Sequence, residues 1–233
     1  MSFTEVGEHL AIALPGGTAL FTTRRGGVSE GPYASLNLGL KTDDDPERVR
    51  ANREKVARLV GGRVAQPHQV HGTRVVAADP DAGTAPDADG QVTAEPGVAP
   101  VVLVADCLPV ALVAPEGVAM LHAGWRGLAG GLLDEGVRAL RALGATRMAA
   151  AIGPGAGACC YEVGSEVHAA FGIDDPPDRR LDLKGIARER LAAAGVDEVH
   201  DCGLCTMCDP ERFFSHRRDG GVTGRQAGVA WRS

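Results

Sequence analysis

The sequence predicts an α+β fold, a mixed α/β arrangement in which mixed β-sheets are flanked by helices in one compact domain. Short apolar runs alternate with helical patterns along the chain. Two of the runs, PVVLVA and PVALVA, are almost uninterrupted, which is typical of strands buried on both faces. With 233 residues and 44% hydrophobic residues, the chain can bury one sizeable core. We therefore expect a single domain over residues 1–233.

The first long helix is expected to begin after Asp43, Asp44 and Asp45. An Asp cap followed by Pro46 in the first turn is typical of a helix start, and Gly61 marks the end. One apolar stripe should face the core. The stripe consists of Val49, Val56, Leu59 and Val60.

The rest of the chain alternates between strand and helix patterns. Strands are expected over residues 73–78, 98–105, 109–115, 117–122, 147–153 and 196–203. Helices are expected over residues 131–143, 162–171 and 183–195. The segments 79–90 and 174–180 are rich in Pro and Asp, so we expect surface loops there.

The composition argues against several classes of function. A net charge of -6 and a pI near 5.6 do not provide the basic surface that non-specific nucleic-acid binding requires. No apolar run approaches the roughly 20 residues that cross a bilayer, and the N-terminus lacks the pattern of a signal peptide. We therefore expect a cytoplasmic monomer that binds a small molecule, without nucleic-acid or membrane partners. Its six cysteines should then be reduced.

Three apolar runs end at, or break around, reactive side chains. His71 lies in QVHG, Cys107 in ADCLP and His122 in LHAGWRG. One thiolate and two imidazoles suit zinc, and three protein ligands leave the fourth tetrahedral position open for catalysis. The spacing alone leaves another interpretation open, because a lone strand His is commonly a satisfied polar group and a lone buried Cys commonly packs in the core.

The motifs QVHG, ADCLP, LHAGWRG, GPGAGACCYEVG and FFSHRRDGGVTGRQAG, with TTRRGGVSEGPYASLNLG before them, resemble those of the bacterial YfiH family of laccase-domain proteins. The resemblance implies a compact fold of YfiH-like topology and a zinc ion bound by His71, Cys107 and His122. Members of the family are labelled polyphenol oxidase (laccase), purine nucleoside phosphorylase with adenosine deaminase activity, or peptidoglycan editing factor. A more distant similarity to cysteine hydrolases of the deamidating-toxin type matches Cys107 and His122 to their Cys and His.

Physical chemistry separates these labels in part. Laccase chemistry needs a multi-histidine copper cluster, and the 7 His of this chain show none of the paired H-x-H motifs that usually build one. Zinc therefore fits better, although copper would bind the same three ligands. Zinc activates water and polarises the group under attack, which suits hydrolytic chemistry such as adenosine deamination. In that reaction Asp106 would either shuttle a proton or orient His71 or His122.

Phosphorolysis of a purine nucleoside requires a phosphate held by arginines and backbone donors. The candidates are Arg24, Arg126, Arg217, Arg218 and Arg225. Arg24 and Arg126 are the preferred pair, since one lies in TTRRGG and the other follows a ligand in HAGWRG. For any single Arg the alternative is a solvated surface charge. Asn37 and Gln69 would supply neutral hydrogen bonds to base or ribose, and Cys160 would line the pocket.

The C-terminal part of the chain offers a second group of thiols. Cys202, Cys205 and Cys208 have two overlapping C-x-x-C spacings, which suit a structural zinc site or a redox pair. The candidates for a fourth zinc ligand are His200, Cys159 and Cys160. The alternative is a buried strand end that leads to Phe213 and Phe214, two residues expected in the core.

The two adjacent cysteines restrict this second site. In extended chain, Cys159 and Cys160 point to opposite faces, so both cannot easily serve one site. The related family commonly has another Cys in a GPC-type segment, where this chain has Gly155. No role is therefore expected for a cysteine at that position.

Four functions stay open at this point. The leading hypothesis is a zinc-dependent purine nucleoside phosphorylase for adenosine, inosine and guanosine, with an accompanying adenosine deaminase activity. A second is a peptidoglycan editing amidase acting on a UDP-linked cell-wall precursor, with the zinc site or Cys107 providing the nucleophile. The others are a copper-dependent polyphenol oxidase (laccase) and a non-enzymatic metal- or nucleotide-binding protein.

Overall fold

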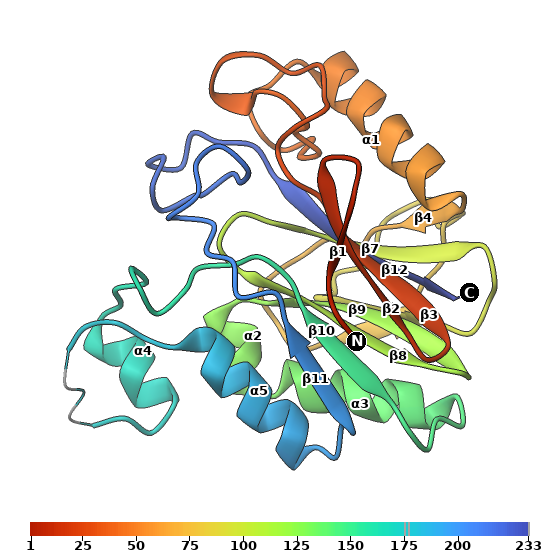
Figure 1. The fold of residues 1–233 in the computed structure, drawn as a ribbon, viewed down its shortest axis with the longest axis vertical. Helices are drawn as coiled ribbons and strands as arrows, with labels where there is room; N and C mark the ends of the chain where they lie inside the picture. Colours follow the sequence, from red (N-terminus) through yellow and green to blue (C-terminus); the bar gives the residue numbers. More distant parts are fainter. Residues whose placement is uncertain (175, 177, 233) are drawn as a thin grey trace.

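Two six-stranded sheets form the centre of the computed structural model, which describes residues 1–174, 176 and 178–232 (Figure 1). In spatial order, the first sheet consists of β1 (Thr4–Val6), β2 (His9–Leu14), β3 (Gly17–Phe21), β12 (Gln226–Arg232), β7 (Val98–Val104) and β4 (Arg63–Ala65). The second consists of β11 (Glu198–Asp201), β10 (Ala149–Ile152), β8 (Leu108–Ala114), β9 (Gly117–Ala123), β6 (Gly90–Thr93) and β5 (Val75–Ala77). Both sheets mix parallel and antiparallel pairs.

Helices cover the outer face of each sheet, which gives the fold four layers. The helix α1 (Pro46–Val60) lies over the first sheet. The helices α2 (Trp125–Gly130), α3 (Leu132–Ala142) and α5 (Leu183–Ala193) lie on the far side of the second (Figure 1). Two shorter elements complete the set: the 3-10 helix η1 (Gly31–Tyr33) and α4 (Ser165–Ala170). The predicted α+β class, with mixed sheets flanked by helices, is confirmed.

The central strands are buried on both faces, as their apolar runs predict. Every residue of β8 and β9 is buried, and so is every residue of β7 except Leu103. Phe21 and Met120 belong to the apolar cluster between the two sheets. Leu112 and Leu121 belong to the cluster between the second sheet and its helices. Because these strands lie inside the stack of layers, water reaches neither of their faces.

The hairpin of β8 and β9 brings two predicted ligands together. Its antiparallel register pairs Leu108 with Ala123 and Pro109 with His122. Cys107 directly precedes β8, while His122 lies near the end of β9. The start of β8 therefore lies beside the end of β9, and the two reactive residues lie at the same end of the hairpin.

The first predicted helix is present with its caps. The Asp45 carboxylate accepts a hydrogen bond from the backbone N–H of Glu47 at 2.9 Å, and Gly61 ends the helix with a φ of 63°. The buried stripe consists of Val49, Asn52, Val56 and Val60. The prediction was wrong for Leu59, which is 42% exposed. With about 3.6 residues per turn, this position points away from the face that packs on the sheet.

Several strands could not be predicted, because their sequences show too weak a strand pattern. No strand was predicted for the regions that form β1, β2, β3, β4, β6 and β12. The last strand, β12, inserts between β3 and β7 and pairs antiparallel with both. Such a partnership between the two ends of the chain depends on tertiary contacts rather than on local periodicity.

The prediction of a surface loop over residues 79–90 was wrong for the last three of these residues. Ala88 and Asp89 are both 0% exposed, and Gly90 begins β6. A buried carboxylate at this position needs hydrogen-bond partners, which lie in the site described below. The other expected loop, 174–180, includes residues 175 and 177, which lie outside the described residues.

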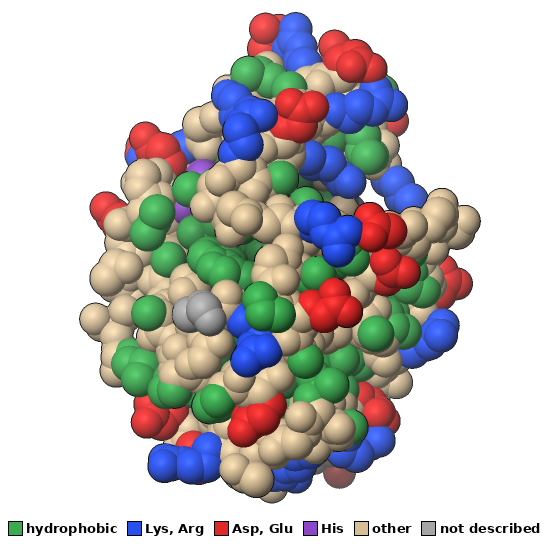
Figure 2. Space-filling model, turned by 90° about the vertical axis from the view of Figure 1, so that its right-hand side faces the viewer, with side chains coloured by type: hydrophobic (Ala, Val, Ile, Leu, Met, Phe, Trp, Pro, Cys, Tyr) green, Lys and Arg blue, Asp and Glu red, His purple; other side chains and the backbone are tan. Residues whose placement is uncertain are grey.

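The surface carries both signs of charge. On the face shown in Figure 2, Lys and Arg side chains are mixed with Asp and Glu side chains. The net charge of the chain is -6. None of the described helices combines the length and the apolar character needed to span a bilayer.

Candidate metal centre

His71, Cys107 and His122 meet at one point, and we call this group the candidate metal centre. Their ligand atoms all lie within 4.8 Å of one another. The two imidazole rings lie edge to face, with centroids 4.8 Å apart and planes at 74°. His71 comes from the segment between β4 and β5, and the other two residues come from the β8–β9 hairpin. Two distant parts of the chain thus build one site, in which His71 is exposed and His122 is buried.

Asp89 holds both histidines in place. Its buried carboxylate accepts hydrogen bonds from the backbone N–H groups of Val70 (3.1 Å), His71 (2.9 Å) and Gly72 (2.6 Å). The same carboxylate bonds to Nδ1 of His122 at 2.8 Å, which leaves Nε2 as the nitrogen that a metal would bind. Burial opposes ionisation of Asp89, but these hydrogen bonds and the charge of His122 outweigh it and lower its pKa.

Backbone strain is concentrated at this site. Among the described residues, the non-glycine residues with positive φ are His71 (60°) and Asp106 (92°). Each such conformation costs about 1–3 kcal/mol and persists where surrounding contacts hold it. Asp89 supplies those contacts at His71, and the backbone N–H of Ala156 donates to the carbonyl of Asp106 at 2.8 Å. Strain that is held in this way at His71 and directly before Cys107 is typical of a functional site.

Gly124, directly after β9, leaves the space in which the ligands approach one another. A Cβ at this position would lie 3.0 Å from Sγ of Cys107 and 3.2 Å from Cδ2 of His71. The φ of Gly124 is -70°, which any residue adopts, so the requirement is for space rather than for backbone freedom. This close approach explains the first glycine of HAGWRG.

The charges around Cys107 favour its thiolate. Burial alone would raise the pKa of the thiol, but charge attraction and hydrogen bonds from His122 and His71 lower it to about 6. Burial would likewise lower the pKa of His122, but Cys107 and Asp89 raise it to about 9. A thiolate at neutral pH is the form that binds a metal or acts as a nucleophile.

The donor set fits a zinc ion. Zinc binds thiolate sulfur at about 2.3 Å and imidazole nitrogen at about 2.0–2.1 Å, so three ligand atoms within 4.8 Å of one another can close on one ion. The hydrogen bond between Asp89 and Nδ1 of His122 is of the kind that usually orients a metal-binding histidine. Three ligands leave one tetrahedral position for a substrate.

A pocket of about 610 Å³ opens onto the two histidines of the centre. Its volume lies within the range of about 300–1,000 Å³ that is usual for small-molecule sites. Besides His71 and His122, it is lined by the cationic side chains of Lys41, Arg53 and Arg225. An anionic ligand could therefore lie beside the centre.

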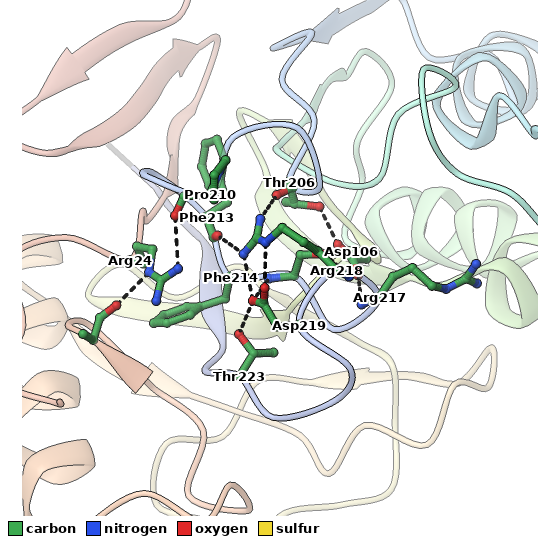
Figure 3. A network of polar contacts seen from close by, with 12 residues as sticks. Arg24, Asp106, Thr206, Pro210, Phe213, Phe214, Arg217, Arg218, Asp219 and Thr223 are labelled. Atoms are coloured by element: carbon green, nitrogen blue, oxygen red, sulfur yellow. Dashed lines mark hydrogen bonds and ion pairs between the residues drawn. The ribbon is translucent and has the colours of Figure 1, made fainter. Parts of the chain in front are cut away.

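Asp89 makes the contacts with the histidines that were predicted for Asp106. The Asp106 carboxylate accepts hydrogen bonds from Oγ1 of Thr206 (2.7 Å) and from the backbone N–H of Arg217 (2.8 Å), as Figure 3 shows. It therefore anchors the C-terminal loop beside Cys107 and has no histidine partner among its hydrogen bonds in the described chain. The carboxylate of Asp89 escaped prediction because turn-forming residues precede it, although the strand-like run after it was a signal.

Neither member of the preferred phosphate pair lines the pocket. Arg24 donates to two backbone carbonyl groups, at 2.7 and 3.1 Å, and lies over the ring of Phe214 (Figure 3). Arg126 is exposed and lies 4.2 Å from the centroid of the Trp125 ring. Arg24 and Arg126 are both absent from the lining of the pocket, so the structure does not bring this pair together there.

The two arginines of the SHRRDG segment serve the C-terminal loop. Arg218 donates to the carbonyl of Thr206 at 2.7 Å and pairs with the Asp219 carboxylate, also at 2.7 Å (Figure 3). Arg217 donates to the carbonyl of Glu162 at 2.6 Å. Both guanidinium groups hold loop segments together, and neither lines the pocket.

Some of the remaining substrate-binding candidates line the pocket, while others bind backbone groups of the protein or lie elsewhere. Arg225 lines the pocket, and its backbone N–H donates to Oδ1 of the fully buried Asn37 at 2.9 Å. Gln69 also lines the pocket, but its amide bonds the N–H and C=O of Leu103, each at 2.8 Å. Cys160 lies in a cluster of thiols instead of the pocket. Gln69 thus forms part of the pocket wall, Asn37 is absent from its lining, and Arg225 stays a predicted binding residue.

Three ionisable residues of the pocket were not predicted from the sequence, namely Lys41, Arg53 and His68. Arg53 lies on α1, donates to a backbone carbonyl at 2.8 Å, and has a pKa lowered by burial. His68 bonds Asp87 through Nδ1 at 2.7 Å and Lys41 through Nε2. A signal for His68 was present, since it lies three residues before a predicted ligand.

Comparisons with known proteins identify sequences that are similar to this chain over most of its length. Residues 18–233 match the model of a family described as multi-copper polyphenol oxidoreductase laccase. A protein of Pseudomonas aeruginosa named purine nucleoside phosphorylase is 41% identical over 227 residues, covering 91% of this chain and 92% of that protein. Purine nucleoside phosphorylase YfiH of Escherichia coli is 38% identical over 231 residues, covering 93% and 94%.

A solved structure supports the fold directly. The crystal structure of a Neisseria meningitidis protein superposes with a TM-score of 0.89 at 40% sequence identity. The match covers 97% of this chain and 99% of that chain. The YfiH-like topology implied by the sequence motifs is thereby confirmed.

Proposed function

We propose that this chain, which belongs to the family described as multi-copper polyphenol oxidoreductase laccase, is a zinc-dependent purine nucleoside phosphorylase. Its substrates would be phosphate and adenosine, inosine or guanosine, with adenosine deamination as a second reaction of the same site. One observation carries the proposal: two of the three residues of the candidate metal centre also line the 610 Å³ pocket. Relatives 41% and 38% identical to the chain are named purine nucleoside phosphorylases.

The arrangement of possible metal ligands supports zinc over multicopper chemistry. Among the described residues, the groups arranged to hold a metal are the candidate metal centre and one cluster of four cysteines. A multicopper oxidase would need further histidines gathered beside the first site, where oxygen is reduced. His68 is the other histidine of the pocket, and it is bonded to Lys41 and Asp87. The ligands therefore favour one zinc ion at the centre.

The side chains of the centre would hold and orient this ion. When bound, zinc would supply a Lewis acid that stabilises negative charge on the reacting groups. His71, Cys107 and His122 would be its ligands, and Asp89 would fix the orientation of His122 and the backbone at His71. This support keeps the ligands in place before substrate arrives, which lowers the cost of reorganisation during the reaction.

We assign phosphate binding to Arg53 and Arg225. Both line the pocket, and burial lowers the pKa of both guanidinium groups, which nevertheless remain protonated. A partly buried guanidinium attracts phosphate more strongly than an exposed one, because less water screens the charges. Orienting phosphate in this way prepares it to attack the ribose carbon of the glycosidic bond.

Lys41, held in place by His68, is the candidate for stabilising the leaving purine. His68 lines the pocket, and Asp87 holds its Nδ1 at 2.7 Å, which fixes the orientation of the ring. The Lys41 ammonium donates to Nε2 of His68, so the ring positions this positive charge in the pocket. A purine that leaves its ribose gains negative charge, and a positioned ammonium group stabilises that charge.

An assay of products tests the proposed activity. Purified protein loaded with zinc is incubated with adenosine, inosine or guanosine and phosphate, and the mixture is analysed by mass spectrometry. We expect free base and ribose 1-phosphate, inosine from adenosine, and none of these products with the Cys107→Ala variant. The absence of base and ribose 1-phosphate at substrate-saturating concentrations would refute the phosphorylase.

A second function is favoured by the alignment of Cys107, His122 and Asp89. In covalent amide hydrolysis, Cys107 would be the nucleophile, His122 the base and Asp89 the carboxylate that orients the base. The alternative is therefore a cysteine amidase acting on a UDP-linked cell-wall precursor. Removal of metal with a chelator separates the two functions, because it abolishes a zinc-dependent phosphorylase and leaves a cysteine amidase active.

A further inference from the structure

Four thiols lie together outside the candidate metal centre, and we call Cys159, Cys160, Cys205 and Cys208 the four-cysteine cluster. Their sulfur atoms all lie within 4.8 Å of one another. Cys160 Sγ lies 3.6 Å from Cys159 Sγ, 3.4 Å from Cys205 Sγ and 3.4 Å from Cys208 Sγ. The Cys159 and Cys208 sulfurs are 3.3 Å apart. Each thiol thus has others as direct neighbours.

The turn at residues 158–160 allows two adjacent cysteines to serve one site. The backbone N–H groups of Cys160 and Tyr161 both donate to the carbonyl of Gly157, at 3.1 and 3.0 Å. The chain is therefore curved here, and the expectation that Cys159 and Cys160 point to opposite faces of an extended strand was wrong. The turn directs both sulfurs to the same side, where they meet Cys208.

The spacing of the sulfurs is that of a tetrahedral metal site. Zinc with metal–sulfur bonds of about 2.3 Å places four thiolate sulfurs about 3.8 Å apart. The four sulfurs are spaced close to this value and come from two loops, so an ion between them would have four protein ligands and no open position. We infer that the four-cysteine cluster binds a structural zinc ion, distinct from the candidate metal centre.

Backbone contacts show what this ion would hold together. Gly155 and Cys205 form an isolated parallel bridge, and the N–H of Thr206 donates to the carbonyl of Gly155 at 3.1 Å. The N–H of Gly157 donates to Sγ of Cys205 at 3.3 Å, which is a common support for a zinc-bound thiolate. The zinc would therefore join the loop after β10 to the loop after β11.

This junction lies next to the candidate metal centre. Thr206, the residue after Cys205, donates through Oγ1 to the carboxylate of Asp106 at 2.7 Å. Asp106 has a positive φ and directly precedes Cys107. The structural zinc would thus stabilise the loop that positions a ligand of the first metal, without touching substrate.

Cys202 provides the matched control for this inference. It lies in the same C-x-x-C-x-x-C segment, yet it is outside the cluster, and its sulfur lies 3.9 Å from Nζ of Lys184. His200, a predicted fourth ligand, is also outside the cluster and lies 3.3 Å from Glu198. The substitutions Cys202→Ser and His200→Ala should therefore leave the metal content unchanged.

Counting metal in purified full-length protein tests the inference. By elemental mass spectrometry, we expect two zinc ions per wild-type chain and one in Cys208→Ser or Cys159→Ser. Cys107→Ala should also keep one, while Cys202→Ser and His200→Ala should keep two. A count of two that survives both cluster substitutions would overturn the inference, and so would a wild-type count of one that falls to none in Cys107→Ala.

Cobalt(II) in place of zinc gives an independent measurement on folded wild-type protein. Because sulfur-to-cobalt charge transfer grows with the number of thiolate ligands, the cluster should supply about four times the absorbance of the single-thiolate centre. Cys107→Ala should therefore keep most of this absorbance. A disulfide within the cluster of protein purified under reducing conditions, found by peptide mass mapping, would instead establish a redox pair and overturn the zinc site. Neither measurement uses a nucleoside, so failure of the phosphorylase assay would leave this inference intact.

Discussion

The candidate metal centre and the four-cysteine cluster differ in how their surroundings change the pKa of their thiols. At the centre, two imidazoles overcome the effect of burial and lower the pKa of Cys107 to about 6. In the cluster, burial and neighbouring thiols raise the pKa of Cys160, and a hydrogen bond with Cys159 contributes most to raising that of Cys208 to about 11. Cys205 differs from them, because backbone N–H groups outweigh burial and lower its pKa to about 7.

Access to the two sites differs as well. The centre has three ligand groups, two of which line a pocket of about 610 Å³, so a metal held there would be accessible to a small molecule. The cluster has four ligand groups that face one another. Similar ligand atoms thus suit catalysis in one place and loop stabilisation in the other, because the number of ligands decides whether a position stays open.

The largest expected effect comes from removing a ligand of the centre. His71→Ala or Cys107→Ala should reduce activity to background and remove the zinc of the centre, while the zinc of the cluster stays. The fold should survive, because the His71 side chain is exposed and Cys107 lies at the start of a strand. Zinc content and thermal unfolding check this expectation, with His68→Ala as a control that keeps all the zinc. Equal zinc content in His71→Ala, Cys107→Ala and wild type would remove the distinction between the sites.

A smaller effect is expected when the support of the centre is weakened. Asp89→Asn removes the charge that bonds His122 and three backbone N–H groups. The affinity of the centre for zinc should fall by about 10–100-fold, the usual effect of losing the partner of a metal-binding histidine. Competition with a chromophoric chelator measures this affinity. The cluster should hold its zinc as wild type does; parallel losses at both sites would mean that the substitution unfolds the protein.

Crowding the centre should have a milder effect. In Gly124→Ala, the new Cβ would lie 3.0 Å from the sulfur of Cys107, so the ligands must move apart by a few tenths of an ångström. We expect about 10-fold weaker zinc binding at the centre. Gly83→Ala is the matched control, because its Cβ would meet no atom within 4 Å. Identical zinc affinities in these two variants would contradict the close approach at Gly124.

The smallest effect concerns the loop that connects the two sites. Asp219 pairs with Arg218, which in turn bonds the carbonyl of Thr206 beside the cluster. Burial opposes the ionisation of Asp219, but Arg218 and Thr223 outweigh it and lower the pKa below 3.8. Asp219→Asn should lower Tm by about 2–4 °C, the shift that about 1 kcal/mol causes in a domain of this size.

The pH dependence of this loss follows from the lowered pKa. A carboxylate whose pKa is lower in the folded protein stabilises it fully above 3.8, and this stabilisation is lost as the pH falls through the folded value. The Tm difference between Asp219→Asn and wild type should thus be constant above about pH 5 and vanish in stronger acid. A difference that grows on acidification would contradict the ion pair.

Much of the fold and of the centre could be predicted because the signals are local. The helix α1 carries its own caps at Asp45 and Gly61, and β8 and β9 carry continuous apolar runs. His71, Cys107 and His122 each lie in a motif at the end of such a run. The proximity of the three side chains in the structure agrees with the predicted ligand set.

The sequence by itself determined which residue types could hold a metal, because a thiol and two imidazoles have that chemistry wherever they meet. The tertiary structure alone decided that Asp89 supports them and that Arg225, not Arg24, reaches the pocket. It also decided that Cys159 and Cys160 turn to the same side. These outcomes depend on which distant segments of the chain pair, as when β12 inserts between β3 and β7. Local sequence patterns do not contain this information, because the pairing depends on tertiary contacts.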